Sequence, residues 1–155
     1  MLAQARARFP ELHLTQADLL HELPAELEQP FDRVVSAYVL HEFDLDAKIA
    51  LLQRIAARQL APGGCILIAD IAFPTALARQ KAAERWGDAW DEEEEYWAAD
   101  EGLAACERAG FQVTYRQISS CAGIFTLTLA GATTGDVLDR HSGETIGNPS
   151  NQESD

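Results

Sequence analysis

The chain has 155 residues, of which 47% are apolar and 24% are charged, and its formal net charge at pH 7 is −13. This length accommodates one domain with a sizeable core, and the composition excludes a largely disordered chain. The acidic surplus repels phosphate backbones, so nucleic acid is not expected as a partner.

Targeting and membrane signals are missing from the sequence. No stretch approaches the ~20 consecutive apolar residues of a membrane helix, and the opening MLAQARARFP lacks the apolar run of a signal peptide. The three cysteines have no CxxC spacing, so neither a disulfide framework nor a metal site is indicated. We expect a cytoplasmic protein with no membrane partner.

The first thirty residues predict little regular structure. Residues 2–9 are rich in alanine and arginine and predict a helix that ends before Pro10. The stretch LHLTQADLL, residues 12–20, alternates in hydrophobicity and predicts a short strand. Residues 21–30 contain two prolines and predict a loop with one helical turn.

A strand and a helix follow. FDRVVSAYVL, residues 31–40, is β-branched and aromatic, and it predicts a strand buried on both faces from Val34 to Ala37. Asp44 or Asp46 is placed to cap the next helix, whose apolar residues recur at helical spacing. The sequence APGG, residues 61–64, ends that helix.

The second half predicts a strand, two helices and a hairpin. CILIADIAF, residues 65–73, predicts a buried strand, and a helix runs from Pro74-Thr75 to about Trp86. A second helix is predicted over 93–109, with Gly110 as its left-handed cap. Residues 111–119 and 123–131 alternate as an antiparallel hairpin, and the polar residues 132–155 predict a disordered tail.

This order of elements predicts an α/β domain with a mostly parallel sheet that ends in an antiparallel hairpin. Right-handed crossovers place helices on both faces of such a sheet. Ligands bind outside the carboxyl ends of its strands. The turns after Ala17 and Ala37 are therefore expected to open onto one cleft.

The stretches FDRVVSAYVLHEFD, LAPGG and CILIADIAF, in this order and spacing, resemble the class I methyltransferases that use S-adenosylmethionine (SAM). The resemblance covers about residues 1–130. It implies a Rossmann-like, doubly wound sheet over a domain at 1–131, SAM as cofactor, and methyl transfer to a small-molecule acceptor.

Two parts of the family pattern are absent from this sequence. There is no glycine-rich loop after a first strand, and there is no acidic residue that would hold the ribose hydroxyls. The opening MLAQA is similar to the helix that follows that acidic residue in the family. We therefore expect a truncated methyltransferase domain without its first two strands, with impaired activity, low stability and an exposed sheet edge that invites self-association.

The resemblance also implies a cofactor site. Asp18 would accept a hydrogen bond from the adenine amino group, Leu19 would pack on the adenine ring, and the backbone of Ala37 would lie beside the methionine part of SAM. Tyr38 would lie there too, as a candidate catalytic residue. The structural alternatives are a turn aspartate, a core leucine and a buried aromatic residue.

His41 is the best candidate for a catalytic residue on the acceptor side. A histidine can act as a general base near neutral pH, although methyl transfer can also proceed by alignment of the acceptor alone. Glu42 is interpreted as a solvated or capping carboxylate. The run DEEEE, residues 91–95, offers a metal cluster as one reading, but it is interpreted as a solvated helix start because it lies ahead of a helix and no histidine lies near it in the sequence. Trp90 is a candidate for the acceptor pocket, with ordinary packing as the alternative.

Three functions remain open from the sequence. The first is SAM-dependent methyl transfer. The second is a non-catalytic methyltransferase remnant that acts as an interaction module or pairs with another chain. The third is a fragment of a nicotinamide oxidoreductase, which the terminal hairpin disfavours.

Overall fold

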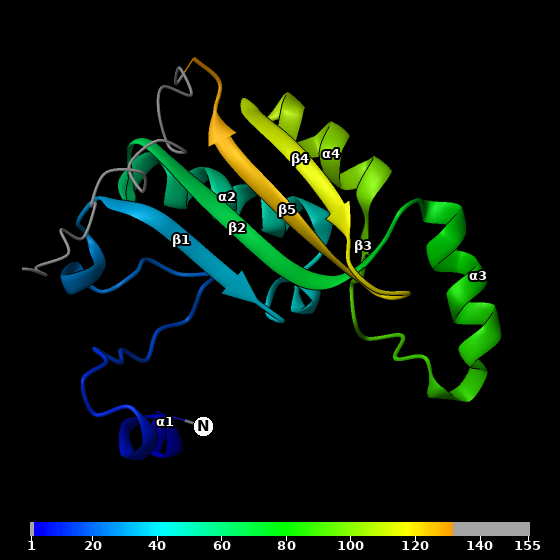
Figure 1. The fold of residues 1–155 in the computed structure, drawn as a ribbon, viewed down its shortest axis with the longest axis horizontal. Coiled ribbons are helices and arrows are strands. Elements are labelled where there is room, and N and C mark those ends of the chain that lie inside the picture. The colour runs from blue at the N-terminus through cyan, green and yellow to red at the C-terminus, as the bar shows by residue number, and fades with distance from the viewer. Residues whose placement is uncertain (1, 132–155) are drawn as a thin grey trace, which may run out of the picture.

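The computed structural model describes residues 2–131, so the tail predicted at 132–155 lies outside the described residues. Its main feature is a mixed sheet (Figure 1). In spatial order the strands are β1 (Phe31–Ala37), β2 (Leu60–Phe73), β5 (Ala122–Leu129) and β4 (Phe111–Gln117). The β1–β2 pair is parallel, and β5 is antiparallel to both β2 and β4. The predicted α/β fold with a closing hairpin is confirmed.

Short and long helices alternate with these strands. The α-helices are α1 (Leu2–Arg8), α2 (Leu45–Arg58), α3 (Ala76–Trp86) and α4 (Ala99–Arg108). Single 3₁₀ turns are η1 (Ala25–Leu27), η2 (Leu40–Glu42) and η3 (Gly87–Ala89). A two-residue strand, β3 (Trp97–Ala98), pairs with the end of β2.

The predicted helix caps are confirmed. The Asp44 carboxylate accepts a hydrogen bond from the backbone N–H of Ala47 at 2.8 Å and begins α2. Thr75 caps α3 in the same way. Gly110 follows α4 with a φ of 94°, a left-handed conformation that glycine adopts without steric cost.

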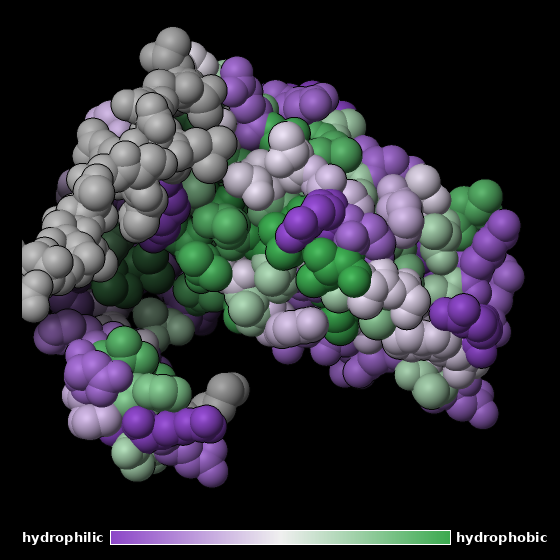
Figure 2. Space-filling view, in the orientation of Figure 1, coloured by the Kyte–Doolittle hydropathy of each residue, from purple (hydrophilic) through white to green (hydrophobic). Residues whose placement is uncertain are grey.

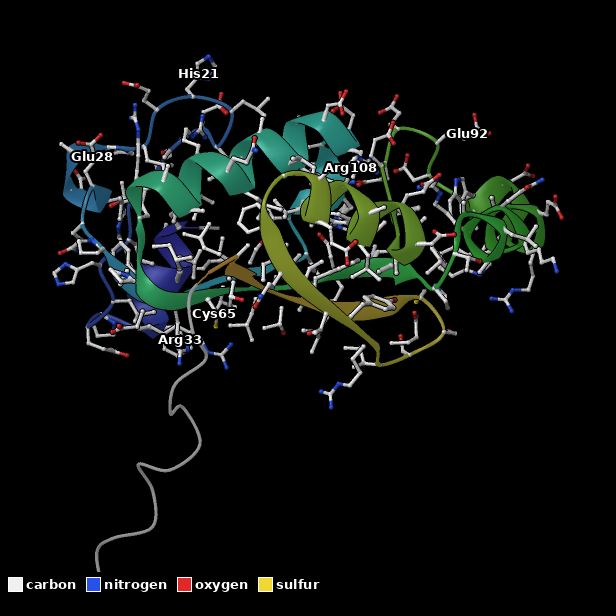
Figure 3. The ribbon with its side chains drawn as sticks, turned by 90° about the horizontal axis from the view of Figure 1, so that it is seen from above. His21, Glu28, Arg33, Cys65, Glu92 and Arg108 are labelled. Atoms are coloured by element: carbon white, nitrogen blue, oxygen red, sulfur yellow. The ribbon has the colours of Figure 1, made fainter. Side chains whose placement is uncertain are left out.

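Both α2 and α4 lie on one side of the sheet, and they cover the core there (Figure 3). Side chains of β2 and β5 that point to this side are fully buried, among them Ile66, Ile68, Phe125 and Leu127. Cys65, on the opposite face of β2, points away from α2 and α4. The prediction of helices on both faces is wrong for residues 2–131, where the second face has no such helical layer.

Three further expectations fail for physical reasons. Residues 12–20 form no strand, because they find no strand to pair with and alternation alone does not create a ladder. The strand over Val34–Ala37 is not buried on both faces, since β1 is the last strand of the sheet and Val35 is 69% exposed. The helix predicted over 93–109 begins only at Ala99, because residues 91–96 form an irregular loop and residues 97–98 join β2.

A small aromatic cluster lies beside the main core at the end of β2. Phe73, Trp90 and Tyr96 contact one another, with ring centroids 4.7 Å apart for Trp90 and Tyr96. Trp86 packs edge-on against Trp90. This packing accounts for Trp90 as a structural residue. Within residues 2–131, no helix combines the length and the apolar character needed to cross a bilayer.

Candidate functional site

An apolar groove of about 370 Å³ runs along the free edge of β1. One wall is the amino-terminal segment, which contributes Leu19 and Leu23, and the other wall is α2 with Leu52 and Ile55. Val34 lies between the walls. The volume falls in the range of small-molecule sites, which is ~300–1,000 Å³.

The groove reaches both ends of β1. Phe31 and Gln59 line it where the strand begins, and Ala37 and Val39 line it where the strand ends. Seven strand residues span about 20 Å, so the groove is elongated. In Figure 2, hydrophobic residues gather around the hollow between the amino-terminal segment and the body of the sheet.

Two of the predicted cofactor residues meet in this groove. Leu19 and Ala37 both line it, together with Ala17, although about twenty residues separate the two turns in sequence. The turns after Ala17 and Ala37 therefore face a common space. Thr15 and Ser36 are the hydroxyl-bearing residues in the lining.

Asp18 does not line the groove, because its carboxylate serves its own turn. It accepts hydrogen bonds from the backbone N–H of Leu20 and from Nδ1 of His21, both at 2.9 Å. The Leu20 hydrogen bond, followed by the His21 contact, lowers the pKa of Asp18. The structure matches the turn aspartate that was the alternative for this residue.

Tyr38 lies at the carboxyl end of β1, outside the groove. Its side chain is exposed and its φ is 54°, a left-handed conformation that costs a non-glycine residue about 1 kcal/mol or more. Its backbone N–H donates to the carbonyl of Ala69 at 2.9 Å and extends the β1–β2 ladder by one step. The chain turns sharply after this residue and enters η2.

His41 is buried in η2 and bound to the end of β2. Its Nδ1 lies 2.5 Å from Oδ1 of Asp70, which is itself 1% exposed. Oδ2 of Asp70 accepts from the backbone N–H groups of Leu40 and His41, at 2.9 and 3.2 Å. The Asp70 carboxylate therefore fixes both the backbone of η2 and the orientation of the imidazole.

The loop formed by residues 91–96 covers His41. The backbone N–H of Glu95 donates to the carbonyl of His41 at 2.7 Å, and Oε2 of Glu94 lies 3.4 Å from His41 Nε2. Arg79 of α3 donates to the carbonyl of Tyr96 at 2.8 Å and fixes the end of the loop. The interpretation of 91–95 as a solvated helix start far from any histidine is wrong, since folding brings His41 to Glu94.

Lys48 of α2 is buried below the same loop. Its ammonium group donates to the carbonyl of Glu95 and lies 4.7 Å from the centre of the Trp97 ring. Desolvation lowers the pKa of Lys48 to about 8, against the opposing effect of Glu95 and Asp70. The loop is thus held from η2, α2 and α3.

Sequence reasoning missed Asp70, Lys48 and Glu94. Asp70 carried a signal, because it is the one charged residue in the apolar run CILIADIAF. Lys48 interrupts the apolar face of α2, between Leu45 and Leu52. Glu94 has no such signal among its four neighbouring carboxylates, and only the fold distinguishes it.

Comparison with solved structures identifies the fold. The chain is similar to a complex named DhpI-SAM-HEP, with a TM-score of 0.63 and 17% identity over 82% of this chain and 63% of that one. It is similar to the mitomycin 7-O-methyltransferase MmcR, with a TM-score of 0.59 and 19% identity over 83% and 37% of the two chains. It is also similar to human N-acetylserotonin methyltransferase in complex with SAM, with a TM-score of 0.54 and 19% identity over 75% and 33%.

The sequence itself has no comparable match: no family model fits it, and no curated protein matches it. The chain spans 63% of the length of DhpI and a smaller part of the two longer methyltransferases. Over residues 2–131, this chain has the fold of the class I SAM-dependent methyltransferases.

Proposed function

We propose that the chain is a SAM-dependent methyltransferase domain, over residues 1–131, that acts on a small-molecule acceptor. The observation that carries the proposal is the groove along β1, which both Leu19 and Ala37 line, in a chain with a methyltransferase fold. Solved structures of this fold with SAM or SAH in their titles, DhpI and human N-acetylserotonin methyltransferase, support the choice of cofactor.

Some of the residues that line the groove would suit one half of SAM. Adenine is a flat ring with apolar faces, and Ala17, Leu19 and Val39 offer an apolar surface for it. Asp18 lies next to this surface, and its carboxylate has lone pairs left for the adenine amino group. The backbone of Ala37 would lie beside the methionine part.

The polar half of SAM has fewer partners here. A ribose and an amino-acid group need hydrogen-bond donors and acceptors, and the sequence contains neither the glycine-rich loop nor the ribose-binding acidic residue of the family. The proposal therefore includes weak cofactor binding and impaired activity for this chain.

When bound, SAM supplies an electrophilic methyl group on its sulfonium. The chain's own contribution on the acceptor side would come from Tyr38 and His41. Tyr38 presents an exposed phenol at the end of β1. His41 is held by Asp70 at Nδ1, so that Nε2 is the nitrogen free to hold a proton or another ligand. Positioning of the acceptor would then supply much of the rate.

The proposed partners follow from charge and from the sheet edge. A net charge of −13 favours a small acceptor over nucleic acid. Within residues 2–131 no strand pairs with the outer edge of β1, and this edge would allow self-association by strand addition. The three free cysteines are in keeping with a reducing compartment, such as the cytoplasm.

Calorimetric titration of the full chain with SAM tests the proposal. Leu19→Asp places a charge in the groove and should abolish the binding heat. Leu20→Asp is the matched control, because Leu20 is exposed and does not line the groove. Absence of binding to the unmodified chain, or equal binding by both variants, would refute the cofactor site and favour the alternative of a non-catalytic interaction module.

A further inference from the structure

The surroundings of His41 determine which nitrogen of its imidazole carries the proton. Asp70 accepts from three backbone N–H groups, those of Leu40, His41 and Ile71, and contacts Nδ1, which favours an ionised carboxylate and a proton on Nδ1. The lone pair of a neutral imidazole is then on Nε2. This nitrogen points toward the 91–96 loop.

The group that Nε2 faces is also an acceptor. Oε2 of Glu94 lies 3.4 Å away, is buried, and has no hydrogen-bond donor among residues 2–131. A side-chain oxygen of Glu42 completes the group, and the three ligand atoms lie within 4.8 Å of one another. Acceptors that converge in this way repel one another unless a positive charge lies between them.

The spacing suits a metal ion. Nitrogen and oxygen ligands bind zinc at ~2.0–2.2 Å, so two ligands of a tetrahedral ion are about 3.4 Å apart. That is the separation of His41 Nε2 and Glu94 Oε2. Metal-binding histidines characteristically donate their other N–H to a carboxylate, and Asp70 occupies that position for His41.

We infer that His41 Nε2, Glu94 and Glu42 bind a divalent first-row transition-metal ion, such as Zn²⁺ or Mn²⁺. One imidazole and two carboxylates are ligands that such ions accept. The site is preorganised, because the hydrogen bond from Glu95 to the His41 carbonyl ties the 91–96 loop to η2. Three protein ligands leave at least one coordination position for water or for an oxygen of a small ligand.

This inference does not depend on methyl transfer. It excludes His41 as a general base, however, because a metal on Nε2 prevents that nitrogen from accepting a proton. The competing description of the same geometry is a doubly protonated His41 between Asp70 and Glu94, with no metal affinity.

The test uses the full chain without a polyhistidine tag, freed of metal by dialysis against a chelator. Titration with Zn²⁺ is followed by calorimetry, and titration with Co²⁺ by its visible absorption. We expect one ion per chain. Glu94→Gln and Glu42→Gln should each weaken binding by more than ~10-fold, since even the loss of a residue that only positions a ligand costs about that much. His41→Gln should do the same.

Glu92→Gln is the matched control. Glu92 belongs to the same acidic run, but it is exposed and projects outward from its loop (Figure 3), and it is not among the converging ligands. The two glutamate variants decide the test even if His41→Gln fails to fold, because they leave the buried Asp70–His41 contact intact. The inference is overturned if the unmodified chain binds neither Zn²⁺, Co²⁺ nor Mn²⁺, or if Glu94→Gln and Glu92→Gln bind equally well. SAM titration of the same samples reports separately on the proposed function.

Discussion

Oδ1 of Asp70 lies 2.5 Å from Nδ1 of His41, and this contact joins the end of β2 to the 3₁₀ turn that follows β1. The same carboxylate also receives the N–H groups of Leu40 and His41. One buried side chain therefore fixes the carboxyl ends of two neighbouring strands relative to each other.

Asp70→Asn should destabilise the fold. The amide removes the charge and one acceptor, and it leaves a backbone N–H or the His41 Nδ1–H without a full partner in a buried site, at a cost of about 2–3 kcal/mol. Urea denaturation measures the free energy of unfolding. Asp32→Asn, at an exposed position of β1, is the control and should change it by less than ~0.5 kcal/mol. Equal effects of the two substitutions would mean that Asp70 does not organise this end of the sheet.

Tyr38→Gly should separate stability from activity. Glycine relieves the left-handed strain at φ 54°, so the free energy of unfolding should stay unchanged or rise by about 1 kcal/mol. Under the proposed function, methyl transfer to the acceptor should fall. The control is Ala37→Gly in the extended strand, where glycine should cost ~0.5–1 kcal/mol. If Tyr38→Gly lowers the free energy of unfolding more than Ala37→Gly does, the backbone of Tyr38 is not strained.

Lys48→Met should reveal the cost of a buried ammonium group. Burial lowers the pKa of Lys48 from 10.5 to about 8. Between these pH values the unfolded chain therefore binds more protons than the folded chain, and the free energy of unfolding of the wild type increases as the pH rises. The full gain corresponds to about 3 kcal/mol. Methionine has no such dependence, so the variant's advantage near pH 7 should shrink as the pH approaches 10.5.

The measurement is urea denaturation of both chains across that pH range, compared as a difference so that other titrating groups cancel. Lys81→Met, at an exposed position on α3, is the matched control. A stability difference for Lys48→Met that is constant with pH would show that the ammonium group is not desolvated.

Val35→Lys should weaken self-association without unfolding the chain. Val35 is exposed on the edge strand, and lysine on an edge strand discourages strand addition. Analytical ultracentrifugation over a concentration series should show a shift of the variant toward monomer. Leu77→Lys, an equally exposed apolar position on α3, is the control. If Leu77→Lys weakens self-association and Val35→Lys does not, the contact between chains lies elsewhere than on β1.

Local signals predicted most of the fold. The Asp44 cap, the apolar run of β2 and the alternating hairpin each depend on neighbours in sequence, and all three are confirmed. The stretch 12–20 failed because a strand also needs a partner strand. The helix start near residue 93 failed because β3 pairing with β2 competes with helix formation there.

The residues of the candidate site also differ in how far the sequence predicts them. The sequence predicted His41 as a polar residue after an apolar strand, and the family resemblance predicted Leu19 and Ala37, although the strand expected before Leu19 does not form. Glu94 was not identifiable, since its approach to His41 depends on the path of a loop over fifty residues away in sequence. Asp70 could have been found, because a single carboxylate in a buried strand requires several donors.

The one-sided helical covering of the sheet has a calorimetric consequence. Side chains on its second face, such as Leu67 and Ile124, remain half-hydrated in the folded chain. Unfolding then adds less newly hydrated apolar area than it does in a domain with two covered faces, so the heat-capacity increment should fall below the customary ~12–15 cal/mol/K per residue. The plot of free energy against temperature is correspondingly broad and shallow, and cooling weakens this fold less than it weakens a fully layered one.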